Sequence, residues 1–165
     1  MFNLKRLSKN GIPTALKKAE RYRLLNEPKD AESICLDILE RDPKNQKAVA
    51  ALLLAITDQF DQGIPAEANR ARDLLPRLKS KYERTYYDGI ICERMAKAIL
   101  NRGVPGAKSY AYQWFREAME LFENAETLRP PGNEAAILRW NTCARIISKE
   151  NLTAMKEEAV QTFLE

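Results

Sequence analysis

Apolar residues recur at three- and four-residue steps along almost the whole chain, in segments that proline, glycine and asparagine interrupt. This period matches the turn of an α-helix, whereas a half-buried strand alternates between apolar and polar residues. Runs of alternating β-branched residues are absent, so the pattern predicts helices and no strands. The interruptions divide the chain into about eight expected helices, at residues 13–25, 28–41, 45–60, 65–79, 81–101, 105–128, 134–149 and 153–164.

Local signals mark the starts of these helices. Proline suits a first helical turn, where the amide hydrogen that it lacks has no partner, and four residues are placed in this way: Pro13, Pro28, Pro65 and Pro105. Asn45 and Asn133 are expected N-caps, and Ser80 has Glu83 at the spacing of a capping box. The connections are short, so we expect consecutive helices to pack as antiparallel hairpins.

The composition argues against most catalytic chemistry. The chain has 165 residues, of which 45% are apolar, enough to build a hydrophobic core without disulfides. It contains no histidine, so Ser–His and Cys–His nucleophile pairs and imidazole metal sites are excluded. Cys35, Cys92 and Cys143 are odd in number and widely spaced, so we expect reduced thiols packed in the core. We therefore expect no enzyme, and no metal or other cofactor.

Nothing in the sequence predicts a membrane protein. The longest continuous apolar run, residues 48–56, is shorter than the roughly 20 residues that cross a bilayer as a helix. The basic and amphipathic residues 1–11 lack the continuous apolar stretch of a secretory signal. These features predict a cytoplasmic protein with no transmembrane segment.

Positive charge is concentrated near the amino terminus. The whole chain has a net charge of +4. Within residues 1–25, Glu20 is the one acidic residue, and the basic ones are Lys5, Arg6, Lys9, Lys17, Lys18, Arg21 and Arg23. A solvated helix face is the common explanation of such a patch, and contact with an anionic partner is the alternative.

Residues 12–45 contain a regular spacing of small residues and proline. Ala31 follows Ala19 by twelve residues, and Pro43 follows after twelve more. Paired helices approach to about 8–10 Å where the crossing residues are small, and Pro43 would end the second helix. This pattern, over a period of about 34 residues, resembles a tetratricopeptide repeat (TPR). The resemblance implies an all-α solenoid of antiparallel helix hairpins, wound as a right-handed superhelix.

Later parts of the chain resemble less regular repeats. Residues 45–79 fit a second unit with a lengthened loop, and residues 80–131 fit a third with two overlong helices, in which Gly89 is the small crossing residue. The resemblance divides the chain into a basic N-terminal segment at residues 1–11, a TPR-like repeat domain at 12–149 and a C-terminal capping helix at 150–165. A non-repeating helical bundle is the alternative architecture.

Proteins that resemble this family bind an extended peptide or a helix along the concave surface formed by the first helices of successive hairpins. The resemblance therefore implies a non-catalytic protein-binding scaffold or adaptor whose partner is a protein or peptide. It places ten residues on the concave groove: Leu16, Glu20, Arg23, Lys47, Ala50, Leu54, Asp58, Tyr86, Ile90 and Glu93. A binder of nucleic acid or an anionic surface through the basic first helix, and a secretion-type TPR chaperone, are the alternatives.

Two further expectations concern the partner. Some relatives hold a terminal carboxylate in a clamp that needs asparagine where this chain has Glu20, and a carboxylate there would repel an acidic tail. We therefore expect no binding of acidic chaperone tails. Tyr87 and Tyr112 lie off the main apolar stripes, which makes them candidates for partner contact, although core filling is the commoner role.

Overall fold

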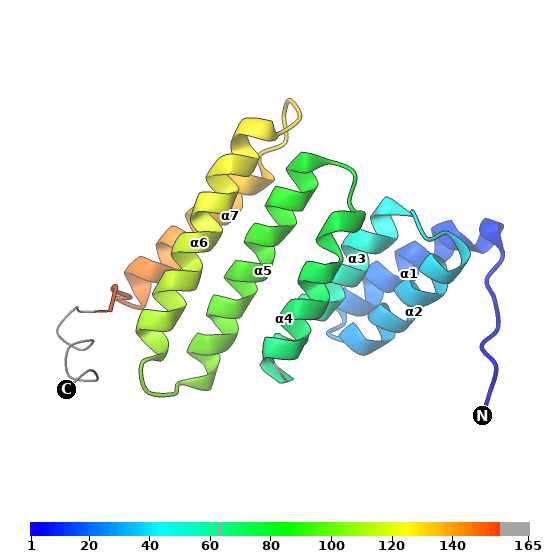
Figure 1. Cartoon of the computed structure of the whole chain (residues 1–165), viewed down its shortest axis with the longest axis horizontal. Helices are drawn as coiled ribbons and strands as arrows, with labels where there is room; N and C mark the ends of the chain where they lie inside the picture. The colour runs from blue at the N-terminus through cyan, green and yellow to red at the C-terminus, as the bar shows by residue number, and fades with distance from the viewer. Residues whose placement is uncertain (63, 156–165) are drawn as a thin grey trace.

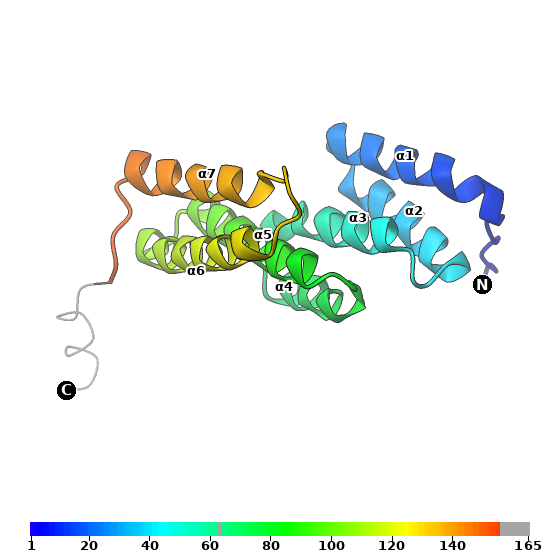
Figure 2. The ribbon, with the colours of Figure 1, turned by 90° about the horizontal axis from the view of Figure 1, so that it is seen from above.

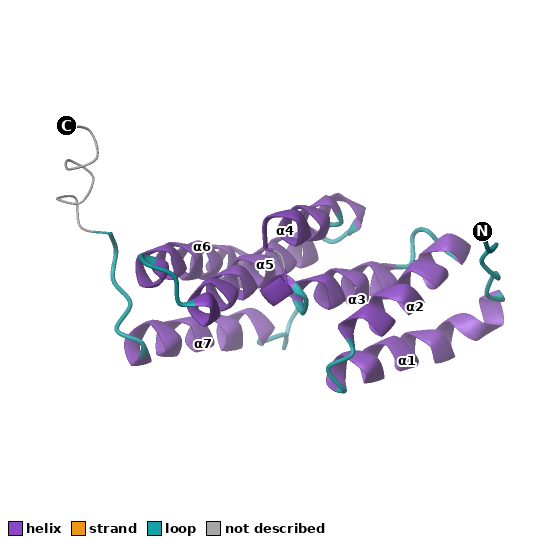
Figure 3. Ribbon diagram, turned by 90° about the horizontal axis from the view of Figure 1, so that it is seen from below, coloured by secondary structure: helices purple, strands orange, loops and turns teal. Residues whose placement is uncertain are grey.

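A computed structural model describes residues 1–62 and 64–155 of the chain, and all regular secondary structure in these ranges is helical. The α-helices there are α1 (Ile12–Leu24), α2 (Pro28–Arg41), α3 (Gln46–Thr57), α4 (Ile64–Asp73), α5 (Lys81–Arg102), α6 (Ala107–Leu128) and α7 (Ala135–Lys149). Short 3-10 helices lie at Lys9–Gly11, Phe60–Gln62 and Leu75–Arg77. The predicted all-α class is confirmed for the described part of the chain, and Figure 3 shows helices and loops alone.

The structure corrects the ends of three predicted helices. The segment expected at 65–79 is α-helical only to Asp73, because Pro76 lacks an amide donor and a 3-10 turn takes over at Leu75–Arg77. The segment expected at 45–60 stops at Thr57. The segment expected at 105–128 begins at Ala107, because Gly106 has a left-handed φ of 80°.

The predicted terminal helix at 153–164 falls mainly outside the described residues. Thr153–Met155 are not helical. Positions 156–165 lie beyond the part of the chain that the structure describes.

Side-chain caps fix the starts of α3 and α5 as the sequence predicted. The Asn45 side chain accepts a hydrogen bond from the Ala48 amide at 3.0 Å, and the Ser80 hydroxyl accepts one from the Glu83 amide at 3.2 Å. Both bonds satisfy amide groups that have no partner inside the helix. The prediction of Asn133 as an N-cap is wrong by one residue, because Glu134 occupies the cap position of α7; the Asn133 side chain still accepts a hydrogen bond from the amide of Ala135 at 3.1 Å.

Consecutive helices lie side by side and alternate in direction along the molecule (Figure 1). Seen from above, α1 and α7 lie on one side of the layer formed by α3 and α5, and α4 and α6 lie on the other (Figure 2). The helices α1 and α7 are well separated on their side. This arrangement positions the candidate site.

Two hydrophobic cores share α5. The first joins α1 to α4 with Ile91, Met95 and Ala98 of α5, and the second joins α6 and α7 with Ile90 and Cys92 of the same helix. Successive residues of a helix point about 100° apart. The helix α5 therefore presents a different side to each core.

Small residues lie where helices pack closely. Ala19 of α1 and Ala31 of α2 are completely buried, which confirms the burial expected of the repeat pattern. Gly89 of α5 packs against the ring of Phe122 in α6, and a Cβ atom at Gly89 would lie 2.6 Å from Cε1 of that ring. The prediction of Gly89 as a small crossing residue is confirmed.

Candidate partner-binding groove

A groove is lined by residues of α1, α3 and α5. It has a volume of about 490 Å³. The residues that line it are Glu20, Arg23, Leu24, Lys47, Ala50, Ala51, Leu54 and Tyr87. We refer to this set as the α1–α3–α5 groove.

Helical spacing explains why these residues share one surface. Glu20, Arg23 and Leu24 are three and four positions apart on α1, and Lys47, Ala51 and Leu54 repeat the spacing on α3. Residues at these spacings lie on the same side of a helix. The opposite side of α3 is apolar and enters the first core.

Five of the ten residues that the sequence placed on a concave groove line this one. They are Glu20, Arg23, Lys47, Ala50 and Leu54. Asp58, a sixth, lines an adjoining hollow together with Arg23. The structure therefore brings together the residues expected from the first two repeat units.

The residues expected from the third unit do not line the groove. Ile90 is 1% exposed and Glu93 is completely buried, so neither offers surface to a partner. Tyr86 is half-buried, with its ring stacked on Tyr82 and tilted against Phe122. These three positions need correction.

The residues of α5 predicted to face the groove are wrong by one position along the helix. The residues of α5 that line the groove and the adjoining hollow are Tyr87, Arg94, Lys97, Ala98 and Asn101. Tyr87 and Arg94 each follow an expected residue by one position, and one position turns a helical side chain by about 100°. Leu16, on α1, is half-buried and packs against the first core instead of lining the groove.

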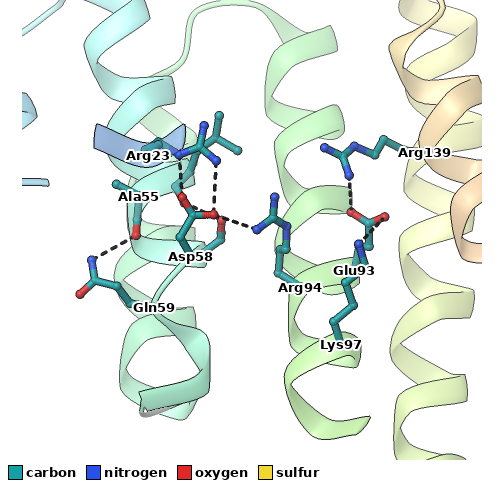
Figure 4. Close-up of polar contacts among 10 residues, drawn as sticks. Arg23, Ala55, Asp58, Gln59, Glu93, Arg94, Lys97 and Arg139 are labelled. Atoms are coloured by element: carbon teal, nitrogen blue, oxygen red, sulfur yellow. Dashed lines mark hydrogen bonds and ion pairs between the residues drawn. The ribbon is translucent and has the colours of Figure 1, made fainter. Parts of the chain in front are cut away.

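Asp58 connects three helices beside the groove. This residue caps the C-terminus of α3, and its carboxylate accepts hydrogen bonds from Arg23 Nε of α1 at 2.7 Å and from Arg94 Nη1 of α5 at 2.8 Å (Figure 4). Arg23 Nη2 donates a third bond at 3.3 Å. These contacts join residues more than thirty positions apart, so no local motif could reveal them.

Glu93 connects α5 to α7 in a similar way. Its carboxylate lies 3.3 Å from Arg139 Nη1 of α7 and 3.6 Å from Lys97 Nζ, one turn along α5 (Figure 4). The Cys143 thiol also donates to it, with Sγ and Oε1 3.8 Å apart. These contacts compensate the burial of the carboxylate, which would be costly without a partner.

The hollow lined by Asp58 adjoins the groove. It has a volume of about 280 Å³ and shares Arg23 with the α1–α3–α5 groove. A third hollow, of about 670 Å³, lies at the ends of α5, α6 and α7 and shares Lys97 and Asn101 with the second. The shared residues make the second hollow a neighbour of both the groove and the third hollow.

Apolar side chains are also exposed at the groove. Leu24 lines it and is 87% exposed, beside the half-buried Leu54 and Tyr87. Tyr112, the other tyrosine proposed for partner contact, packs against the second core. The groove therefore combines apolar surface with charged groups at its edges.

The basic residues of α1 divide into two groups. Lys17, Lys18 and Arg21 are exposed on the helix, whereas Arg23 is directed to Asp58 and lines the groove. The arginine of α1 that lines the groove is thus paired with a carboxylate and does not belong to an uninterrupted basic face.

The thiols are poor candidates for catalysis. Burial raises the pKa of Cys35 to about 11 and the pKa of Cys92 and Cys143 to about 12. A thiol attacks as the thiolate, so a raised pKa lowers its reactivity at neutral pH. Over residues 1–62 and 64–155, no group of three or more metal-binding side chains is placed to hold an ion, and no helix is long and apolar enough to span a bilayer.

Comparisons of the chain with protein-family models, with curated protein sequences and with solved structures found no match. The candidate site is therefore defined by the geometry of this chain alone.

Proposed function

We propose that the chain is a non-catalytic protein–protein interaction module, a scaffold or adaptor, that binds a peptide or helix of a partner in the α1–α3–α5 groove. The proposal includes a TPR-like solenoid of helix hairpins and a cytoplasmic location. The spacing of Ala19, Ala31 and Pro43 supports the solenoid, and the three free, buried cysteines support a reducing compartment.

The observation that carries the proposal is an exposed leucine beside an open groove. Leu24 is 87% exposed at the edge of a hollow whose floor includes Ala50, Ala51 and Leu54. Exposed apolar surface next to a concavity is typical of sites that bind peptides or helices. Burying Leu24 against a partner would remove apolar area from water, which is the main driving force of association.

A selection experiment tests this proposal. The full chain is immobilised and exposed to a phage-displayed library of random linear peptides, and the peptides retained are synthesised and titrated. We expect Leu24→Ser to weaken their binding about five- to tenfold, because the contact of one buried leucine is lost. We also expect Ala50→Trp to block binding by filling the groove.

The matched control is Leu36→Ser. Leu36 is an exposed leucine on α2 and does not line the groove. Its replacement should change affinity less than twofold, on the order of the effect of a surface residue away from the interface. Peptides that bind wild type, Leu24→Ser and Ala50→Trp equally would place binding elsewhere and contradict the proposal.

A further inference from the structure

We infer that the partner segment carries acidic side chains, which a row of charged residues across the α1, α3, α5 and α7 surface receives. The inference rests on the proposed function, because it specifies the chemistry of a peptide bound in the same groove. The row contains four cations and two carboxylates: Arg23, Asp58, Arg94, Lys97, Glu93 and Arg139. Figure 4 shows these side chains following one another from α1 to α7.

The carboxylates of this row are less exposed than its cations. The side chain of Glu93 is 0% exposed and that of Asp58 is 17% exposed. The cationic side chains are 22% exposed in Arg23, 25% in Arg94, 35% in Lys97 and 33% in Arg139. Within the row, a visiting group would therefore meet ammonium and guanidinium groups before it met Asp58 or Glu93.

The cations retain hydrogen-bond donors after pairing. A guanidinium group has five N–H donors and an ammonium group has three. Arg94 donates one hydrogen bond to Asp58, and Arg139 donates one to Glu93. Because four cations face two carboxylates, the row keeps an excess of positive charge and free donors. The carboxylates fix the orientation of these donors, which lowers the entropy lost when an anion binds.

The surroundings favour a peptide carboxylate over a nucleic-acid backbone. Leu24, Leu54 and Tyr87 line the groove together with Arg23, the first residue of the row, and they suit an apolar side chain next to an acidic one. A phosphate backbone would bring a continuous line of negative charge past Asp58 and the exposed Asp61 of the same hollow. An acidic side chain needs only a local match with arginine, which binds carboxylates in a bidentate way.

The position of Glu20 fits this placement. Glu20 is exposed and lines the groove, but it does not line the hollow that contains Asp58, Arg94 and Lys97. The repulsion expected from the sequence therefore applies at one end of the groove. We place the acidic residues of the partner at the other end, over Arg94 and Lys97.

The test measures the acidity of the selected peptides and their dependence on single cations. Random peptides are selected on the full chain at low ionic strength and compared with the unselected library. We expect enrichment of Asp and Glu, and affinity that falls with added salt. Arg94→Gln and Lys97→Gln should each weaken the selected peptides about tenfold, as expected for the loss of one charge-assisted contact.

In each variant the buried or half-buried carboxylate keeps one cationic partner. In Arg94→Gln, Asp58 keeps its contact with Arg23 at 2.7 Å, and in Lys97→Gln, Glu93 keeps Arg139 at 3.3 Å. Circular dichroism melting curves establish that each variant is folded. Arg116→Gln is the control, because Arg116 is exposed on α6, outside the groove and its adjoining hollows, and carries the same charge change. Arg116→Gln should change the affinity less than about twofold, as expected for a charged residue that lies away from the bound peptide.

Three results would overturn the inference. Selected peptides without acidic enrichment that still depend on Leu24 would overturn it and leave the proposed function intact. Acidic peptides that bind Arg94→Gln and Lys97→Gln as tightly as wild type would also overturn it. An oligouridine that displaces the selected peptides and depends on Arg94 would assign the row to nucleic acid. Peptides independent of Leu24 and Ala50 would instead contradict the proposed function itself.

Discussion

Gly89 sets how closely α5 and α6 pack. It lies in the interior of α5, where glycine costs about 0.5–1 kcal/mol relative to alanine because of its backbone freedom. The neighbouring helix explains its presence, because a Cβ atom there would lie 2.6 Å and 2.8 Å from two carbons of the Phe122 ring. Phe122 is completely buried, so the ring has little room to move.

Gly89→Ala therefore has two opposite effects on the free energy of unfolding. Helix propensity favours the alanine by about 1 kcal/mol, and overpacking against Phe122 costs about 1–3 kcal/mol. We expect a net destabilisation, measured as a lower urea midpoint at unchanged slope. Gly89→Ala should lower the urea midpoint less in a Phe122→Leu protein than in the wild type, because the smaller side chain leaves room for the added methyl group. An alanine that raises the midpoint would show that α5 and α6 are less tightly packed.

Asp58 illustrates how charge connects helices. A carboxylate at the C-terminus of a helix is unfavourable, because the last carbonyl groups already carry partial negative charge. At the end of α3 this cost is offset by Arg23 of α1 and Arg94 of α5, which both donate to Asp58. Replacing the carboxylate would leave the two arginines close together without their shared partner.

We expect Asp58→Asn to lower the free energy of unfolding by about 1–2 kcal/mol, between the values for exposed and charged hydrogen-bonded pairs. The control is Glu126→Gln, which removes a more exposed pair between Glu126 and Arg129, three residues further along the chain, at 3.6 Å. That change should cost less than about 0.5 kcal/mol. Equal urea midpoints for the two variants would mean that Asp58 does not hold the three helices together.

For the molecule as a whole, the buried thiols set a limit on alkaline stability. Burial raises the pKa of Cys35 to about 11 and of Cys92 and Cys143 to about 12, whereas the ordinary thiol value is 9.0. Between these values the unfolded chain loses thiol protons that the folded chain keeps. Ionisation then favours the unfolded state, so stability falls as pH rises.

We expect a constant urea midpoint as pH rises toward 9, followed by a steady loss above it. Burial also raises the pKa of Tyr87 from 10.0 to about 12, so tyrosine adds to the loss at higher pH. Replacing all three cysteines by alanine should delay the onset, because tyrosine then titrates first. An unchanged onset in that variant would show that the thiols are not the cause. At neutral pH, a thiol-specific reagent should label the native protein only as fast as it opens.

The sequence predicted those features that depend on neighbours along the chain. Asn45 and Ser80 cap helices through contacts three residues away, and Ala19 and Ala31 are recognisable from their spacing. The register of α5 was not predictable in this way, because α5 has buried residues on several sides, including the adjacent Ile90 and Ile91. Its period therefore did not identify the side that faces the groove.

The charged row was beyond sequence reasoning for a related reason. Its contacts join α1 to α5 and α5 to α7, and their existence depends on how the helices pack. Arg23, Asp58 and Glu93 were proposed as partner-facing residues, but their pairing with Arg94, Lys97 and Arg139 was not. Glu93 and Lys97 are four positions apart on one helix, a spacing that the sequence does reveal. The pairs of Asp58 with Arg94 and of Glu93 with Arg139 join different helices, so no spacing in the sequence indicates them.

The sharing of α5 between both cores has a consequence for synthesis of the chain on the ribosome. The amino-terminal helices cannot complete their core until Ile91, Met95 and Ala98 have emerged, although α1 to α4 end at Asp73. During translation, the first core therefore cannot be completed until these residues of α5 have been synthesised. Until then its apolar surface is available to chaperones or to other nascent chains.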